Sequence, residues 1–77
     1  MTTDQYWHIH RAACELANGY FGGFAEAIGT AMLRADSGNL QRLAEAFPDL
    51  IKRAHDFIAA EEAREAIRQA QETEAAK

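Results

Sequence analysis

Small side chains recur at every fourth position between residues 19 and 35 of this 77-residue chain, beside a matching series of large ones. The small series is Gly19, Gly23, Ala27, Ala31 and Ala35, and the large series is Tyr20, Phe24, Ile28 and Met32. Residues four apart are neighbours on the surface of a helix, so the two series predict a groove beside a ridge. Such a surface suits close packing against another helix, and assembly is therefore the property that the sequence describes best.

The size of the chain predicts one all-α domain over residues 1–77, with the end frayed from about residue 70. A domain near this size hides only about 60% of the surface that its unfolded chain exposes, so its own core is small. Cys14 is the only cysteine, which leaves no partner for a disulfide within the chain. Self-association is the remaining way to bury more surface, and we expect a homo-oligomer.

Charge and hydropathy narrow the range of partners. The net charge is −4, from 12 acidic and 8 basic residues, which argues against nucleic-acid binding because phosphate neutralisation needs a basic face. The stretch 16–35 has the length of a membrane span, but Asn18, Glu26 and Arg34 interrupt it, so we expect no membrane insertion. The opening MTTDQYW lacks the basic and apolar segments that direct secretion, and with the free thiol this predicts a cytoplasmic protein.

Capping signals place the start of the first helix near Asp4. Thr2 followed three residues later by Gln5 has the pattern of a capping box, and Asp4 adds negative charge at the positive end of the helix dipole. The apolar pattern then continues through Gly22-Gly23 to the end of the small series, although each glycine costs about 1 kcal/mol in a helix interior. We therefore predict one long first helix, with the two glycines as the place for a kink.

A turn is predicted at residues 36–39, where Asp36 and Ser37 are both suited to cap the next helix. The spacing of four apolar residues then predicts a short second helix. These residues are Leu40, Leu43, Ala44 and Phe47. Pro48 either begins a third helix or kinks a continuous one. In both cases the apolar face that follows Pro48 turns back on the first helix.

The first helix carries two apolar faces. At about 100° per residue, one of them is formed by Ile9, Ala13, Leu16 and Tyr20. A second series at heptad spacing begins at Trp7, and one short partner helix cannot cover both faces, so we expect another copy of the chain to cover the second. The alternative is a single helix that curves around its own small core. The residues expected to pack between copies are Cys14, Gly19, Phe21, Gly23, Phe24, Ala27, Ile28 and Ala31.

No catalytic or metal-binding motif stands out in the sequence. His10 and Cys14 are four apart, with His8 and Glu15 nearby, but structural zinc usually takes four ligands and the only further histidine is the distant His55. A hydrolase built on Cys14 would need a base and an oxyanion hole, which this helix does not provide. We therefore expect no enzymatic activity, no catalytic residue, no bound metal and no cofactor.

The start of the first helix offers a candidate binding surface for an aromatic or anionic partner. Trp7 and Arg11 lie one helical turn apart, and a ring beside a guanidinium suits stacking together with clamping of a phosphate or carboxylate. Tryptophan and arginine are also common anchors of protein interfaces. The alternative is that Trp7 packs between copies of the chain. The full candidate surface consists of Tyr6, Trp7, His10, Arg11 and Asn18.

Residues 35–50, ADSGNLQRLAEAFPDL, resemble a pattern in small, mostly uncharacterised proteins of bacteriophages and prophages. The shared elements are Ala-Asp, an Asn three residues after the Asp, a Leu, then Ala-Phe-Pro and a final Leu. The aromatic and alanine-rich segment 21–32 is similar to a helix of the same family, and the resemblance covers residues 20–58. It implies origin in a mobile element and is nearly silent about activity.

Small acidic helical phage proteins often act stoichiometrically, an analogy of class that gives three hypotheses. The first is a non-enzymatic binding protein that antagonises a host protein, in particular a defence factor, in the host cytoplasm. The second is a homo-oligomeric sponge that sequesters a nucleotide messenger of host immunity between subunits, with Tyr6, Trp7 and Arg11 as contacts. The third is a small structural or assembly factor of the phage.

Overall fold

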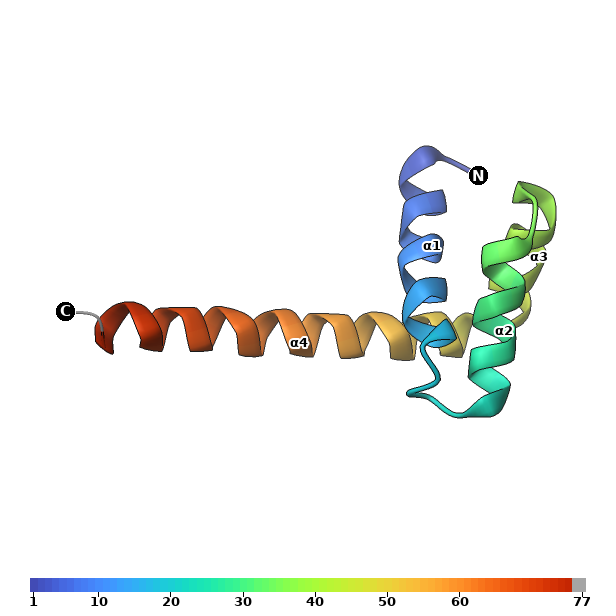
Figure 1. Ribbon diagram of the computed structural model, residues 1–77. Helices are drawn as coiled ribbons and strands as arrows, with labels where there is room; N and C mark the ends of the chain where they lie inside the picture. Colours follow the sequence, from blue (N-terminus) through green and yellow to red (C-terminus); the bar gives the residue numbers. More distant parts are fainter. Residues whose placement is uncertain (76–77) are drawn as a thin grey trace.

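A computed structural model describes residues 1–75, and all of the regular structure in this range is helical. The four helices are α1 (Thr3–Ala17), α2 (Gly23–Arg34), α3 (Ser37–Ala46) and α4 (Pro48–Ala75). In Figure 1, α1 and α2 lie side by side, α3 lies beside α2, and α4 passes across them before its second half projects away from the other helices. The predicted all-α class is confirmed. None of the described helices is long and apolar enough to cross a membrane.

Local capping fixes the start of α1. The backbone N–H of Gln5 donates to the Thr2 hydroxyl over 3.1 Å, and the Thr2 N–H donates to the Gln5 side chain over 2.8 Å. This reciprocal pair is the predicted capping box, which satisfies two amides that have no partner within the helix.

The prediction of one long first helix is wrong, because α1 ends at Ala17 and α2 begins at Gly23. Gly19 and Gly22 have φ angles of +87° and +98°, which lie outside the α-helical region and are readily adopted by glycine. Asn18 closes the turn, since its side-chain oxygen accepts the N–H of Tyr20 over 2.8 Å. The glycines therefore reverse the chain, where a continuous or kinked helix was expected.

The tightest contact between α1 and α2 is made by Gly29, a residue outside the predicted small series. A Cβ at this position would lie 2.6 Å from the Ala17 nitrogen and 2.8 Å from the Ala13 carbonyl oxygen. The break between the helices sets a new phase for α2, so that Ala25, Gly29 and Met32 face the core. The predicted stripe of Gly23, Ala27 and Ala31 instead lies on the surface.

The later helices begin where the sequence predicts. Asp36 caps α3, since its carboxylate accepts the Asn39 N–H over 2.8 Å, and Pro48 is the first residue of α4. Ile51, Ala54 and Ile58 pack α4 against the other helices. Beyond this point every side chain from residue 59 to residue 73 is exposed.

We call residues 59–75 the arm and the remaining described residues the body. The helix continues through Ala75, so part of the segment expected to fray, 70–75, is helical. Residues 76–77, the rest of that segment, lie outside the described residues.

Candidate interaction surfaces

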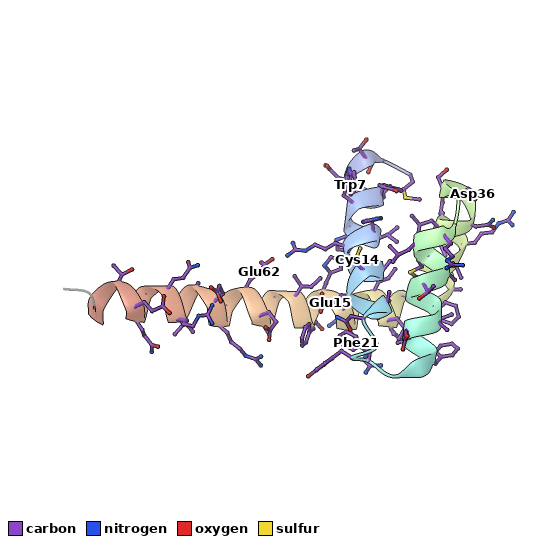
Figure 2. All side chains as sticks on the ribbon, viewed as in Figure 1. Trp7, Cys14, Glu15, Phe21, Asp36 and Glu62 are labelled. Carbon is purple, nitrogen blue, oxygen red and sulfur yellow. The ribbon has the colours of Figure 1, made fainter. Side chains whose placement is uncertain are left out.

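An aromatic cluster occupies the outer side of α1. The ring of Trp7 packs edge-on against Tyr6 and His10, with centroids 5.1 and 5.3 Å apart, and Tyr6 stacks on His10 at 5.8 Å. Trp7 is nevertheless 58% exposed, while Tyr6 packs partly against the core. Figure 2 shows Trp7 near the N-terminal end of α1. The rings hold one another in place, and the surface they form faces solvent.

Cys14 extends this surface by one helical turn. Its Sγ lies 3.8 Å from Nδ1 of His10, and the thiol is free and exposed. Within residues 1–75, no three His, Cys, Asp or Glu side chains are grouped so that they could hold a metal ion. The His10–Cys14 pair is therefore a polar edge of the aromatic cluster.

The other two residues of the predicted surface have structural partners. Arg11 forms an ion pair with Glu62, which joins α1 to the first turn of the arm. Asn18 donates to Glu15 and accepts from the Tyr20 amide in the turn after α1. The structure thus brings Tyr6, Trp7 and His10 together but directs the guanidinium toward α4 and the amide into the turn.

A histidine pair that the sequence analysis missed links α1 to α4. The rings of His8 and His55 stack with centroids 3.8 Å apart, and Nε2 of His55 lies 2.7 Å from the His8 carbonyl oxygen, the geometry of an N–H donated to that carbonyl. Partial burial, and secondarily the nearby charge of His55, lower the pKa of His8 below its ordinary value of 6.5. The two histidines are 47 positions apart in the sequence, so no local pattern could reveal this pair.

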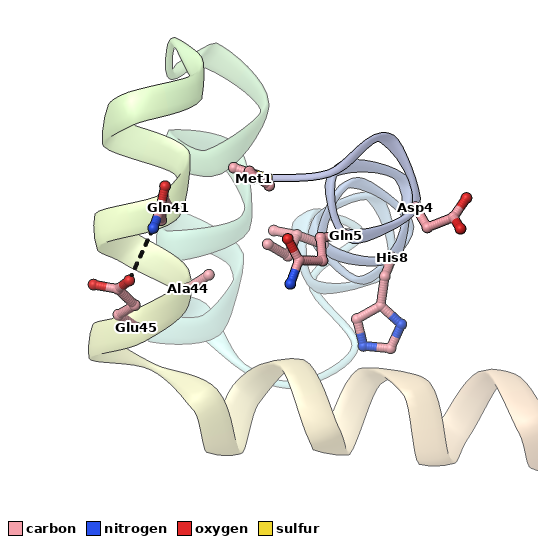
Figure 3. Close-up of a pocket in the computed structure, with 8 residues that line it drawn as sticks. Met1, Asp4, Gln5, His8, Gln41, Ala44 and Glu45 are labelled. Carbon is pink, nitrogen blue, oxygen red and sulfur yellow. Dashed lines mark hydrogen bonds between the residues drawn. The ribbon is translucent and has the colours of Figure 1, made fainter.

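A pocket of about 510 Å³ lies between the start of α1 and α3. Figure 3 shows Asp4 and His8 on the α1 side and Gln41 and Glu45 on the α3 side, where the Gln41 amide donates to the Glu45 carboxylate over 3.1 Å. Met1, Gln5, Ile9 and Ala44 complete the lining. The apolar floor and the two carboxylates suit an apolar or cationic group.

A second hollow, the α2–α3 groove, lies beside the predicted small-residue stripe. Its floor is apolar, and its polar lining consists of Arg34, Asn39 and Arg42 without any carboxylate. Neither arginine forms an ion pair with any residue that the structure describes. The apolar part of the lining is Ala31, Ala35, Leu43 and Ala46.

The residues predicted to pack between copies occupy four different environments. Gly19 is in the turn, and Phe21 is half-buried among Tyr20, Phe57 and the guanidinium of Arg53. Ile28 packs against the core. The remaining five, which are surface residues, are Cys14, Gly23, Phe24, Ala27 and Ala31.

Comparisons of the chain with protein-family models, curated proteins and solved structures found no match. Three aromatic side chains are largely exposed: Trp7 at 58% on α1, Tyr20 at 69% in the turn that follows it, and Phe24 at 65% on α2.

Proposed function

We propose that the protein acts by stoichiometric binding, with the aromatic cluster of Tyr6, Trp7 and His10 as the surface that contacts a protein partner. The observation that carries this proposal is the exposure of Trp7, 58%, although two other rings hold it in place. A held but exposed indole loses little conformational entropy on binding and buries a large apolar area. Tryptophan and tyrosine are the side chains that most often anchor interfaces.

A protein partner suits this surface better than a nucleotide. Clamping a phosphate beside the indole requires a free guanidinium, and the nearest predicted candidate, Arg11, is paired with Glu62. An anionic ligand would have to compete with that carboxylate. A protein partner that offers apolar and hydrogen-bonding groups makes no such demand.

The resemblance to phage proteins directs the proposal toward a host protein as the target, with antagonism of a defence factor in the host cytoplasm as the biological outcome. The mode of action is occlusion, with no enzymatic step. We also propose that the chain self-associates, since a body this small leaves Phe24 and a stripe of small residues on its surface.

The test compares Tyr6→Ala/Trp7→Ala with Ile67→Ala, a matched control that removes an equally exposed apolar side chain from the arm. Tagged proteins are used to capture partners from bacterial lysate, and the captured protein is purified and titrated by calorimetry. We expect the double variant to lose at least about 100-fold in affinity, the effect of removing two interface anchors, while the control binds as wild type.

To test the sponge hypothesis, a panel of cyclic nucleotides is titrated into the protein in the same calorimeter. Nucleotide binding that depends on Trp7 and Arg11, without any captured protein, would replace our proposal with the sponge. Equal capture by wild type and the double variant would place the binding surface elsewhere.

A further inference from the structure

We infer that the face formed by α2 and α3 binds a second copy of this chain about a two-fold axis, with Phe24 of each copy seated in the α2–α3 groove of the other. This inference rests on the proposed self-association and assigns it a surface. It is independent of the aromatic cluster on α1, which lies on another helix.

The first observation is an exposed phenyl ring next to an open apolar groove. Phe24 is 65% exposed and touches Phe47 edge-on, with centroids 5.7 Å apart. Ala31, which lines the groove, lies two helical turns further along the same side of α2, and Ala35, which also lines it, is the residue that caps the end of this helix. The projecting ring and the hollow therefore belong to one face of the molecule.

The second observation is the direction of α2, which makes this face complementary to itself. The ring and the middle of the groove are about nine residues apart on α2, a distance of about 13 Å at the rise of an α-helix. A two-fold axis near the middle of α2 sets two copies of the helix antiparallel, so that Phe24 of each copy lies over Ala31 and Ala35 of the other. A two-fold contact requires this reciprocity, whereas a foreign partner does not.

A small side chain between the ring and the groove permits a close approach. This residue, Ala27, is exposed, one turn after Phe24 and one turn before Ala31. Helices that meet through such residues pack at the short end of the usual interaxial range of about 8–10 Å. The small-residue stripe of the sequence then lies at the centre of the contact.

Charge is the third observation, since the two ends of the face carry opposite charges. Arg34 and Arg42 line the groove, while Asp49 follows Phe47, whose ring contacts Phe24, at the other end of the face. None of these three charged residues has an ion pair within the described part of the chain. The antiparallel arrangement brings the arginines of one copy toward the Asp49 carboxylate of the other. The same arginines lie over the inserted phenyl ring, which favours a cation–π contact.

The test is sedimentation equilibrium on the full chain. We expect the wild type to have the mass of two chains at micromolar concentration. Phe24→Ala should weaken the dimer by about 30-fold or more, as expected for an anchor that acts twice in a symmetric contact. Circular dichroism should show a folded monomer, because Phe24 is mostly exposed.

A charge-exchange experiment makes the result specific to this face. Arg34→Glu/Arg42→Glu should dissociate the dimer, Asp49→Arg should weaken it, and mixing the two variants should restore a species of two chains. Lys52→Glu, which changes an exposed cation outside the groove, is the matched control and should remain dimeric.

Three results would overturn the inference. They are a monomeric wild type at 100 μM, a dimer that survives both Phe24→Ala and the double arginine reversal, and a dimer abolished by Trp7→Ala but not by Phe24→Ala. The tests of self-association and of partner binding are independent. If the chain is a monomer but still binds its target through Trp7, the dimer inference is wrong and the proposed partner surface is not.

Discussion

The body and the arm are both helical, but different interactions hold their helices. In the body, Leu16 and Met32 are fully buried, and Gly29 brings two backbones into contact. In the arm every side chain of residues 59–73 is exposed. Helix propensity and local ion pairs stabilise it, because alanine, glutamate and arginine are good helix formers, and the Arg11–Glu62 ion pair ties its first turn to α1. We therefore expect the stability of the body to depend strongly on single side-chain substitutions. Substitutions in the arm should change the free energy of unfolding little, because its side chains are not packed in a core.

The largest expected difference in stability is between substitutions of a buried residue in the body and of an exposed residue of similar size in the arm. Leu16→Ala should lower the free energy of unfolding by about 3 kcal/mol, since it removes a fully buried side chain and leaves a cavity. Ile67→Ala, at a site 59% exposed, should change it by less than about 0.5 kcal/mol. Urea unfolding followed by circular dichroism at one protein concentration measures both. Similar losses for the two variants would contradict the comparison.

Two glycine substitutions test how far the stability of the body depends on close contact between backbones. Gly29→Ala should destabilise the protein by about 2 kcal/mol, because the new Cβ would lie 2.6 Å from a backbone nitrogen and the helices must separate. Gly23→Ala adds a methyl group where no atom lies within 4 Å, so it should leave the stability of the isolated chain unchanged or slightly higher. Thermal melting of both variants gives the answer, and a stable Gly29→Ala protein would show that the α1–α2 contact is looser than described.

A smaller effect is expected at the turn between α2 and α3. Asp36→Ala removes the cap of α3 and should cost about 1 kcal/mol. Glu61→Ala removes an exposed ion pair with Arg64 in the arm and should cost a few tenths of a kcal/mol. Urea midpoints distinguish the two, and an unchanged midpoint for Asp36→Ala would show that the carboxylate has a role other than capping.

The smallest expected effect concerns pH. Folding lowers the pKa of His8, so the folded state binds fewer protons than the unfolded chain just below pH 6.5. The stability from this pair is complete above that pH and declines as the pH falls through the lowered pKa. We expect a loss of at most about 0.5 kcal/mol, because His8 is exposed and solvent screens the interaction. His8→Gln should flatten the dependence between pH 7 and pH 5 in thermal melts, and an unchanged slope would show that the stacked pair does not titrate.

Local signals in the sequence predicted what local chemistry decides. The Thr2–Gln5 capping box, the Asp36 cap and the helix start at Pro48 each depend on residues within one turn. The capping box was predicted outright, and the other two were each one of two alternatives that the sequence left open. The break after Ala17 was not, because the apolar pattern continues through glycines whose positive φ angles depend on how the helices pack.

The candidate surfaces also contain some contacts that follow from local sequence and others that depend on tertiary packing. The proximity of Tyr6, Trp7 and His10 follows from helical spacing, so the sequence brought them together. The partner of Arg11 is 51 residues away, and its pairing could not be predicted from spacing alone. The α2–α3 groove likewise combines two helices whose relative placement depends on tertiary packing.

Trp7 is the only tryptophan in the chain, which gives the protein a built-in optical reporter. The indole emission, excited selectively beyond the tyrosine absorption band, comes entirely from the proposed partner surface, and an indole 58% exposed emits as a largely hydrated chromophore. A partner that covers this ring removes water from it and shifts the emission to shorter wavelength. Dimerisation through α2 and α3 leaves the emission unchanged, so one unlabelled titration separates the two binding events by colour.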